Sequence, residues 1–196
     1  VPLLGGDTTS SQDRIAINVT AIGRIARAKV KYRSGAREND IVYVTGYLGD
    51  SAQGLLDIRS GVYDSPFIAV HHDPHPCVNE GIWLGNQPEV HAMMDISDGL
   101  ASDLPHILEE SETGAEISIE RIPTRTTVEL AVTGGEDYQL LLTVGAEAAD
   151  RIAAEYVRHF GKPLYGIGRI RSGAPDIIWS DNGEVVRPQW KGFRHF

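Results

Sequence analysis

Two carboxylates and a hydroxyl lie close together in the sequence MDISDGL, residues 94–100. This stretch follows an apolar run and begins a predicted helix. Asp95, Ser97 and Asp98 therefore lie beside backbone N–H groups at the positive end of a helix dipole. Such a junction can bind phosphate, or phosphate together with a divalent metal ion. The alternative is structural: Ser97 or Asp98 caps the helix, and Asp95 is solvated.

Three further segments carry groups of the same chemistry. In GGDTTSS, residues 5–11, Gly6 lets the backbone approach a ligand and Asp7 offers a hard oxygen ligand. Arg33 in RSGA, residues 33–36, can fork onto a phosphate. GGEDY, residues 134–138, presents Glu136 and its neighbouring carboxylate just before a predicted strand. Each segment taken alone is also compatible with an ordinary turn or a solvated loop.

Composition narrows the classes of function. Apolar residues make up 41% of the 196 residues, as in a globular protein. The formal net charge of −9 argues against a nucleic-acid surface, and it fits phosphate ligands only if metal ions supply positive charge. No apolar run is long enough to cross a membrane, and we expect no signal peptide. Cys77 is the only cysteine, which excludes an intrachain disulfide and fits a reducing cytoplasm.

Common catalytic motifs are absent. The sequence contains no Walker A motif, no Gly-x-Gly-x-x-Gly and no His-Glu-x-x-His. The run HHDPH, residues 71–75, suggests metal ligands, but the prolines at positions 74 and 76 favour a rigid surface loop.

The elements that position these groups follow from hydrophobic periodicity. Alternation of apolar residues predicts a half-buried strand over 15–21. Residues 60–77 read as an irregular loop, and Asp181-Asn182-Gly183 as a hairpin turn. We predict further strands at 41–45, 90–94, 117–119, 138–144, 164–170 and 177–179, and helices at 51–59, after residue 99, at 127–132 and at 146–159. Strands and helices mix without strict alternation, which favours a mixed α–β domain.

The order of the motifs resembles the thiamine-monophosphate kinase family. This family belongs to the superfamily that includes aminoimidazole ribonucleotide synthetase and selenophosphate synthetase. The resemblance covers essentially the whole chain, and GGEDY with the terminal Gly-aromatic-x-His-Phe favours the kinases over their relatives. The matching segments are GGDTTS (5–10), RSGA (33–36), VTG (44–46), LGDSA (48–52), MDISDGL (94–100), TGGEDY (133–138) and KGFRHF (191–196).

The resemblance implies a fold and an activity. The fold is α+β, a mixed β-sheet with packed helices, like the C-terminal domain of that superfamily. The activity is Mg²⁺-dependent transfer of the γ-phosphate of ATP to thiamine monophosphate, giving thiamine diphosphate. The family commonly forms homodimers, and no nucleic acid or membrane takes part.

Motif correspondence also implies a role for individual residues. Trp190 is an alternative to Phe193 for stacking on a ring of the substrate. The implied ATP contacts are Gly6, Asp7, Arg33 and Ser97; the Mg²⁺ ligands are Asp7, Asp95 and Asp98; the residues that bind thiamine monophosphate are Glu136 and Phe193.

Two departures from the family pattern matter. The family's N-terminal half, including its Gly-Asp-Asp metal motif, has no counterpart. We therefore expect residues 1–32 to be a remnant of the N-terminal ATP-binding domain, residues 33–196 to be the C-terminal domain, and the chain alone to have little kinase activity. A loop near residues 123–128 is also shortened or unrepresented relative to typical members. Two alternatives stay open: a non-catalytic binding or dimerisation module, and an ATP-dependent relative with a different acceptor.

Overall fold

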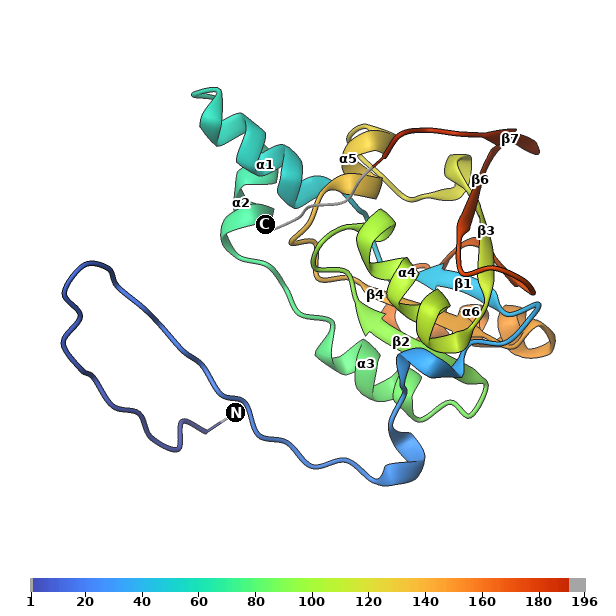
Figure 1. Cartoon of the computed structure of the whole chain (residues 1–196), viewed down its shortest axis with the longest axis horizontal. Coiled ribbons are helices and arrows are strands. Elements are labelled where there is room, and N and C mark those ends of the chain that lie inside the picture. Colours follow the sequence, from blue (N-terminus) through green and yellow to red (C-terminus); the bar gives the residue numbers. More distant parts are fainter. Residues whose placement is uncertain (1, 191–196) are drawn as a thin grey trace.

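The structure is a computed structural model that describes residues 2–190. Residues 2–26 form an exposed N-terminal arm without helix or strand, which leads into the short 3₁₀-helix η1, Arg27–Lys29 (Figure 1). The strand predicted over 15–21 is not formed, and Ile15 and Ile17 are 92% and 84% exposed. Alternating apolar residues form a half-buried strand only where a neighbouring strand pairs with the backbone, and no strand of residues 2–190 pairs with the arm.

One mixed sheet organises the rest of the chain. Its seven strands lie in the order β2-β4-β1-β5-β3-β6-β7, and of its neighbouring pairs only β3 and β6 run parallel. The strands are β1 (Ile41–Val44), β2 (Val90–Asp95), β3 (Gly114–Ser118), β4 (Leu140–Val144), β5 (Tyr165–Arg171), β6 (Ile177–Asp181) and β7 (Glu184–Val186). Asn182 and Gly183 both have positive φ, as the predicted hairpin turn between β6 and β7 requires.

Helices cover both faces of the sheet. Val42 and Val44 of β1 pack in one hydrophobic cluster with Leu104 of α4 (Leu100–Ser111) and with α5 (Val128–Thr133). Tyr43, which points to the other face, packs with Tyr156 of α6 (Ala146–Phe160) and with α3 (Val78–Gly85). Each fully buried large apolar side chain contributes roughly 1.5–3 kcal/mol. The mixed sheet with helices on both faces confirms the predicted α+β fold.

Two helices pack closely at one end of the sheet. They are α1 (Asp50–Arg59) and α2 (Pro66–His72), which lie side by side in Figure 1. A side chain at Gly54 would place its Cβ 2.3 Å from the carbonyl oxygen of Phe67, so only glycine permits this approach. The prediction of an irregular loop over 60–77 is wrong because it overlooked the start signal of α2. The hydroxyl of Ser65 accepts a hydrogen bond from the Phe67 N–H, and Pro66 begins the helix.

The other predicted elements are confirmed to within a few residues, and two short 3₁₀-helices, η2 (Arg33–Gly35) and η3 (Ile119–Arg121), complete the chain. In the part of the chain that the structure describes, none of the helices has the length and apolar character needed to cross a membrane.

Candidate functional site

The loop between β2 and α4 is held by a carboxylate that the sequence analysis did not assign. The backbone N–H groups of Ser97 and Asp98 both donate to Oδ2 of Asp103, each over 2.9 Å. The cap position of α4 is Gly99, which has no side-chain cap bond. Ser97 and Asp98 thus do not cap α4. Because the N–H groups of Ser97 and Asp98 already donate to Asp103, they are not available to bind a phosphate at this junction.

A second loop runs antiparallel beside the first. The N–H of Glu136 donates to the carbonyl oxygen of Ser97 over 2.8 Å, and the N–H of Tyr138 donates to that of Ile96 over 2.9 Å. These bonds continue the pairing of β2 with β4. A Cβ at Gly135 would lie 2.4 Å from the carbonyl oxygen of Ser97, so the glycine allows the two loops to touch. The fold thereby brings Ser97 and Asp98 next to Glu136, although about forty positions separate them in the sequence.

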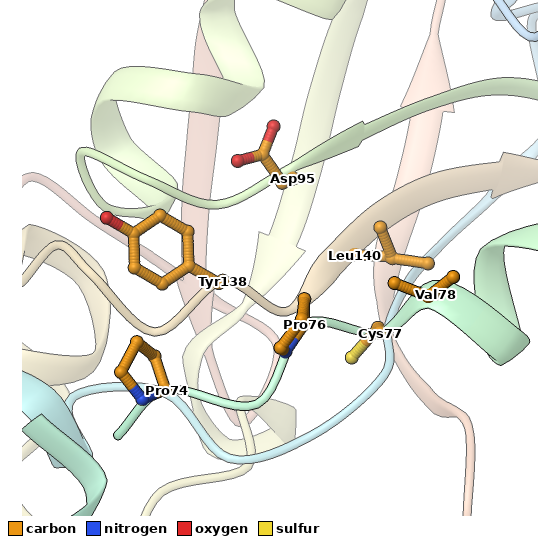
Figure 2. Close-up of a pocket in the computed structure, with 7 residues that line it drawn as sticks. All are labelled: Pro74, Pro76, Cys77, Val78, Asp95, Tyr138 and Leu140. Carbon is orange, nitrogen blue, oxygen red and sulfur yellow. The ribbon is translucent and has the colours of Figure 1, made fainter. Parts of the chain in front are cut away.

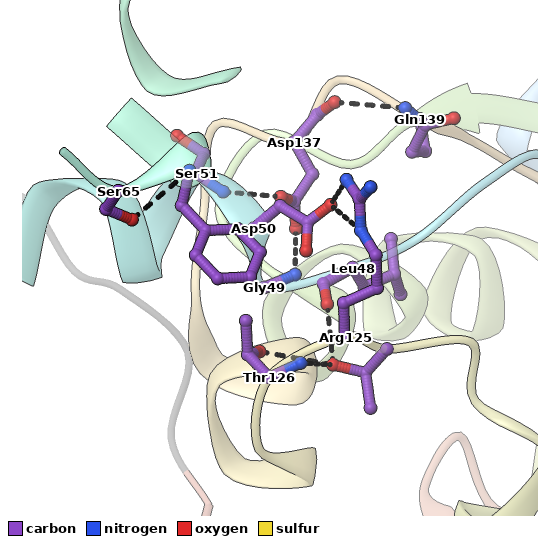
Figure 3. Close-up of polar contacts among 11 residues, drawn as sticks. Leu48, Gly49, Asp50, Ser51, Ser65, Arg125, Thr126, Asp137 and Gln139 are labelled. Carbon is purple, nitrogen blue, oxygen red and sulfur yellow. Dashed lines mark hydrogen bonds and ion pairs between the residues drawn. The ribbon is translucent and has the colours of Figure 1, made fainter. Parts of the chain in front are cut away.

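The second loop is anchored through Asp137. Its two carboxylate oxygens accept hydrogen bonds from the N–H groups of Gly49, over 2.7 Å, and Ser51, over 3.2 Å, at the start of α1 (Figure 3). Burial raises the pKa of Asp137 to about 6, although these backbone bonds act in the opposite direction. Glu136 and Tyr138 on either side adopt positive φ values of 67° and 50°, which cost free energy in residues other than glycine.

Negative charge is concentrated around the first loop. Burial raises the pKa of Asp103, and the nearby charges of Asp98 and Asp95 raise it further. The pKa of Tyr138 is likewise raised by burial, by Glu136 and by the same two aspartates. Asp95 and Asp98 supply the hard carboxylate oxygens that Mg²⁺ prefers, and a cation would offset this repulsion, so the residues fit such an ion.

The remaining implied ligands lie elsewhere. In the arm, the Asp7 carboxylate accepts a hydrogen bond from the N–H of Thr8, and Gly6 has nothing packed against it. Residues 2–190 contain no group of three or more His, Cys, Asp or Glu side chains that could hold a metal ion. The structure thus does not bring Asp7 to Asp95 and Asp98, and the three-residue metal site stays a prediction.

Arg33 is separated from Ser97 by the length of α4. The carbonyl oxygen of Arg33 accepts a hydrogen bond from Ser111 Oγ at the C-terminal end of that helix, while Ser97 precedes its N-terminal end. A 12-residue helix spans roughly 18 Å. Phe193 lies outside the described residues. Trp190, the alternative stacking residue, packs edge-on against Trp179, with 5.2 Å between the ring centroids.

Two pockets meet at Tyr138. One has a volume of about 600 Å³ and is lined by Ser97, Asp98 and Glu136 together with residues of α1 and α5. The other, of about 480 Å³, is mainly apolar, and its lining includes Asp95 and Pro74 on either side of the Tyr138 ring (Figure 2). The polar groups of the first and second loops thus border spaces large enough for small molecules.

The segment expected to be shortened, near residues 123–128, packs on the loop before α1. Thr124 Oγ donates to the carbonyl oxygen of Leu48 over 3.0 Å, and Arg125 forms an ion pair with Asp50 (Figure 3). Tyr47 lies beneath the guanidinium of Arg125, with 4.9 Å to the ring centroid. This segment therefore forms a defined wall near α1.

Comparison with known families supports this reading of the fold. Residues 37–179 match the family described as AIR synthase related protein, C-terminal domain. The chain belongs to this family. As an AIR synthase related domain, it carries Asp95, Ser97, Asp98 and Glu136 within the matched region, whereas the arm and Arg33 precede that region.

Individual relatives of this AIR synthase related domain are similar over almost its whole length. Thiamine-monophosphate kinase of Escherichia coli K12 is 34% identical over 99% of this chain, and that of Bacillus subtilis 168 is 35% identical over 99%. The chain spans only 63% and 64% of the length of these two relatives.

Solved structures show the same relationship. Thiamine-monophosphate kinase from Stenotrophomonas maltophilia is 27% identical, with a TM-score of 0.72 over 83% of this chain and 56% of that one. AaThiL complexed with AMPPCP and TMP is 31% identical, with a TM-score of 0.66 over 84% of this chain and 53% of that one. The hydrogenase maturation protein HypE of E. coli, 21% identical with a TM-score of 0.69, shares the fold.

Sequence reasoning missed the residues that hold this domain's loops in place. Asp103 lies in the first turn of α4, five positions after Asp98, where an acidic residue is common on any helix. Asp137 was visible only as one half of a carboxylate pair. Nothing in the local sequence indicates that its bonding partners would be Gly49 and Ser51.

Proposed function

We propose that this chain is part of a thiamine-monophosphate kinase, which transfers the γ-phosphate of ATP to thiamine monophosphate and forms thiamine diphosphate. The relatives that match 99% of the chain at 34–35% identity carry this name, and AaThiL was solved with AMPPCP and TMP. The observation that carries the proposal locally is the contact between two loops. It brings Ser97 and Asp98, expected near ATP phosphates, beside Glu136, expected to bind the acceptor.

The chemistry of the acceptor suits these residues. The attacking group is itself a phosphate with a second pKa near ~6, so it is largely ionised at neutral pH and needs no general base. The main barrier is the repulsion between two polyanions that must approach in line. Asp95, Asp98 and Asp7 would hold Mg²⁺, which when bound offsets that repulsion and stabilises the charge of the transferred group.

The ATP contacts have to span a considerable length. Because Asp103 already engages the N–H groups of Ser97 and Asp98, Ser97 would reach a phosphate through its hydroxyl group. Arg33 lies at the far end of α4, so an ATP molecule that touches both residues would extend along this helix. Gly6 and Asp7 would contact the same ATP molecule only if the arm folds back over the loop. Their contribution therefore depends on the conformation of residues 2–26.

The acceptor would be selected on the other side of the pocket. Glu136 accepts a hydrogen bond from the amino group of the thiamine moiety, and Phe193 stacks on one of its rings. The packing of Trp190 against Trp179 favours Phe193 over Trp190 for that role. We also propose that the protein works as a homodimer in the cytoplasm, without nucleic acid or membrane, in line with its net charge of −9 and its single cysteine.

The test uses the full-length protein that contains this chain, supplied with ATP, Mg²⁺ and thiamine monophosphate. Glutamine can still accept this hydrogen bond, but a bond to a charged carboxylate is worth about 1 kcal/mol more than one to a neutral acceptor, roughly fivefold in binding. Glu136→Gln should therefore raise the KM for thiamine monophosphate about fivefold and leave the KM for ATP nearly unchanged. Glu110→Gln, which removes the same charge from an exposed position on α4, is the control.

The alternatives give different outcomes. Binding of both ligands without turnover would indicate a binding module, and turnover with another phosphorylated acceptor only would indicate a related kinase. Equal weakening of both substrates by Glu136→Gln would mean that this residue supports the fold rather than the acceptor.

A further inference from the structure

Helix α2 brings a histidine to the carboxylate of Glu136. His71 lies in the last turn of α2, and its Nδ1 is 3.6 Å from Glu136 Oε2. The same Nδ1 is 2.9 Å from Ser51 Oγ on α1. The His71 side chain is only 17% exposed, whereas that of Glu136 is 56% exposed. A largely enclosed ring thus contacts a carboxylate that faces the pocket.

This trio is not a nucleophilic triad. In a triad the histidine takes a proton from the nucleophile on one ring nitrogen and donates to the acid through the other. Here Ser51 and Glu136 both approach Nδ1, and Ser51 is fully buried, so its hydroxyl cannot meet a substrate. Nδ1 instead lies at hydrogen-bond distance from the hydroxyl and in a longer polar contact with the carboxylate. The role of the histidine is therefore to hold the acid.

Close packing fixes the position of His71. A Cβ at Gly54 would lie 2.9 Å from the Cβ of His71 and 2.3 Å from the carbonyl oxygen of Phe67, so α2 rests directly on α1. Glu136 is fixed through its backbone, by its bond to Ser97 and by the anchored neighbour Asp137. Among the ion pairs of residues 2–190, the pair with His71 is the one that the Glu136 carboxylate forms.

We propose that His71 is a positioning residue for acceptor selection: the polar contact of its Nδ1 with Glu136 Oε2 keeps the carboxylate in the orientation that receives the acceptor's amino group. The proposal rests on the proposed function of Glu136. It makes α2, which contributes no predicted contact to ATP or metal, part of the specificity for the acceptor. In this proposal, the HHDPH run contributes the Nδ1 atom of His71, which contacts Glu136, and does not act as a set of metal ligands.

Three substitutions in the full-length protein test which atom matters. His71→Asn keeps an N–H donor near the place of Nδ1, His71→Gln places its amide nearer to that of Nε2, and His71→Phe keeps a ring without a donor. A partly exposed polar contact of this kind corresponds to a change of up to about fivefold in binding. We expect His71→Phe and His71→Gln to raise the KM for thiamine monophosphate about fivefold, with kcat and the KM for ATP nearly unchanged. His71→Asn should restore most of the loss.

The exposed neighbour provides a control. His72→Phe makes the same change one position along α2 and should leave every constant unchanged. A KM for thiamine monophosphate that stays at the wild-type value in His71→Phe would overturn the proposal. So would equal losses in His71→Asn and His71→Phe, because a structural role would then be sufficient.

A second measurement does not depend on kinase activity. In protein with ¹⁵N-labelled histidine rings, the His71 signals report which ring nitrogen carries the proton. They should shift on Glu136→Gln if the pair exists, and this variant retains His71. If the signals shift but the wild-type protein has no kinase activity, the proposed function is rejected and the contact between His71 and Glu136 stands. If the wild-type protein has kinase activity but the signals do not shift, only the contact is rejected.

Discussion

Two substitutions of Asp103 distinguish the contribution of its acceptor oxygen to stability from the contribution of its negative charge. In the β2–α4 loop, the N–H groups of Ser97 and Asp98 donate to the same atom, Oδ2 of Asp103, each over 2.9 Å. The amide oxygen of asparagine can occupy that position and accept both bonds. Leucine has a similar shape and accepts neither. Asp103→Asn should therefore keep the loop in place, and Asp103→Leu should release it.

The magnitude follows from what each variant leaves unpaired. Asp103→Leu removes the acceptor from two N–H groups, each worth ~1–3 kcal/mol when left without a partner. Ser97 and Asp98 are partly exposed, so water replaces some of the loss, and the free energy of unfolding should fall by about 2 kcal/mol. Asp103→Asn removes a buried charge that Asp98 and Asp95 repel, so this variant should be as stable as wild type or more stable.

The pH dependence follows from the sign of the pKa shift. The pKa of Asp103 is raised in the folded protein above its unfolded value of 3.8, so the folded state binds this proton more tightly. The corresponding stability is fully present below pH 3.8 and is lost as the pH rises through the folded pKa. The advantage of Asp103→Asn over wild type should therefore be small near pH 4 and larger at pH 7.

Urea unfolding of the full-length protein at both pH values measures these differences. The reasoning is refuted if Asp103→Asn loses as much stability as Asp103→Leu at pH 7. That result would mean that the negative charge, rather than a single acceptor oxygen, holds the loop.

Three other predictions follow from the same site. Asp137 should lower the free energy of unfolding by up to about 1.4 kcal/mol per pH unit as the pH rises from its unfolded pKa of 3.8 to its folded pKa of about 6; Asp137→Asn should remove this slope in urea titrations, and an unchanged slope would assign it to another group. Asp95→Asn and Asp98→Asn should each lower turnover and raise the Mg²⁺ concentration for half-maximal activity, whereas wild-type magnesium dependence in both would reject the metal role. Gly135→Ala should lower the thermal midpoint because its Cβ would lie 2.4 Å from a carbonyl oxygen of the neighbouring loop, while Gly6→Ala, with open space around it, should not; equal midpoints would show that the loops can separate at little cost.

The sequence predicted the elements whose pattern is strong and long. The amphipathic helix α6 and the apolar strands β1 and β4 were found because each buries a continuous apolar face. The short helix α2 was missed because its seven residues end in two histidines and precede two prolines. The strand predicted over 15–21 is not formed, although its apolar residues alternate, because no strand among the described residues pairs with the arm.

The sequence indicated the two loops of the candidate site but not how they are arranged. Motif order named the β2–α4 loop and the loop that carries Glu136, but their contact depends on β2 pairing with β4 in a register that places Asp95 opposite Leu140. Sequence spacing does not reveal which of seven strands are neighbours. The anchoring role of Asp137 was hidden for the same reason, since its partners come from the start of α1.

Backbone bonds and Asp137 fix the local geometry of the second loop, where we propose that the acceptor binds. Positive φ at Glu136 and at Tyr138 costs of order 1–3 kcal/mol each. The hydrogen bonds of Asp137 to α1, together with the two backbone bonds to the first loop, offset this cost. A loop held in this way fixes the backbone of Glu136 before any ligand arrives. Under the proposed function, the loop backbone would need little reordering when the acceptor binds, so little binding free energy would be spent on ordering it.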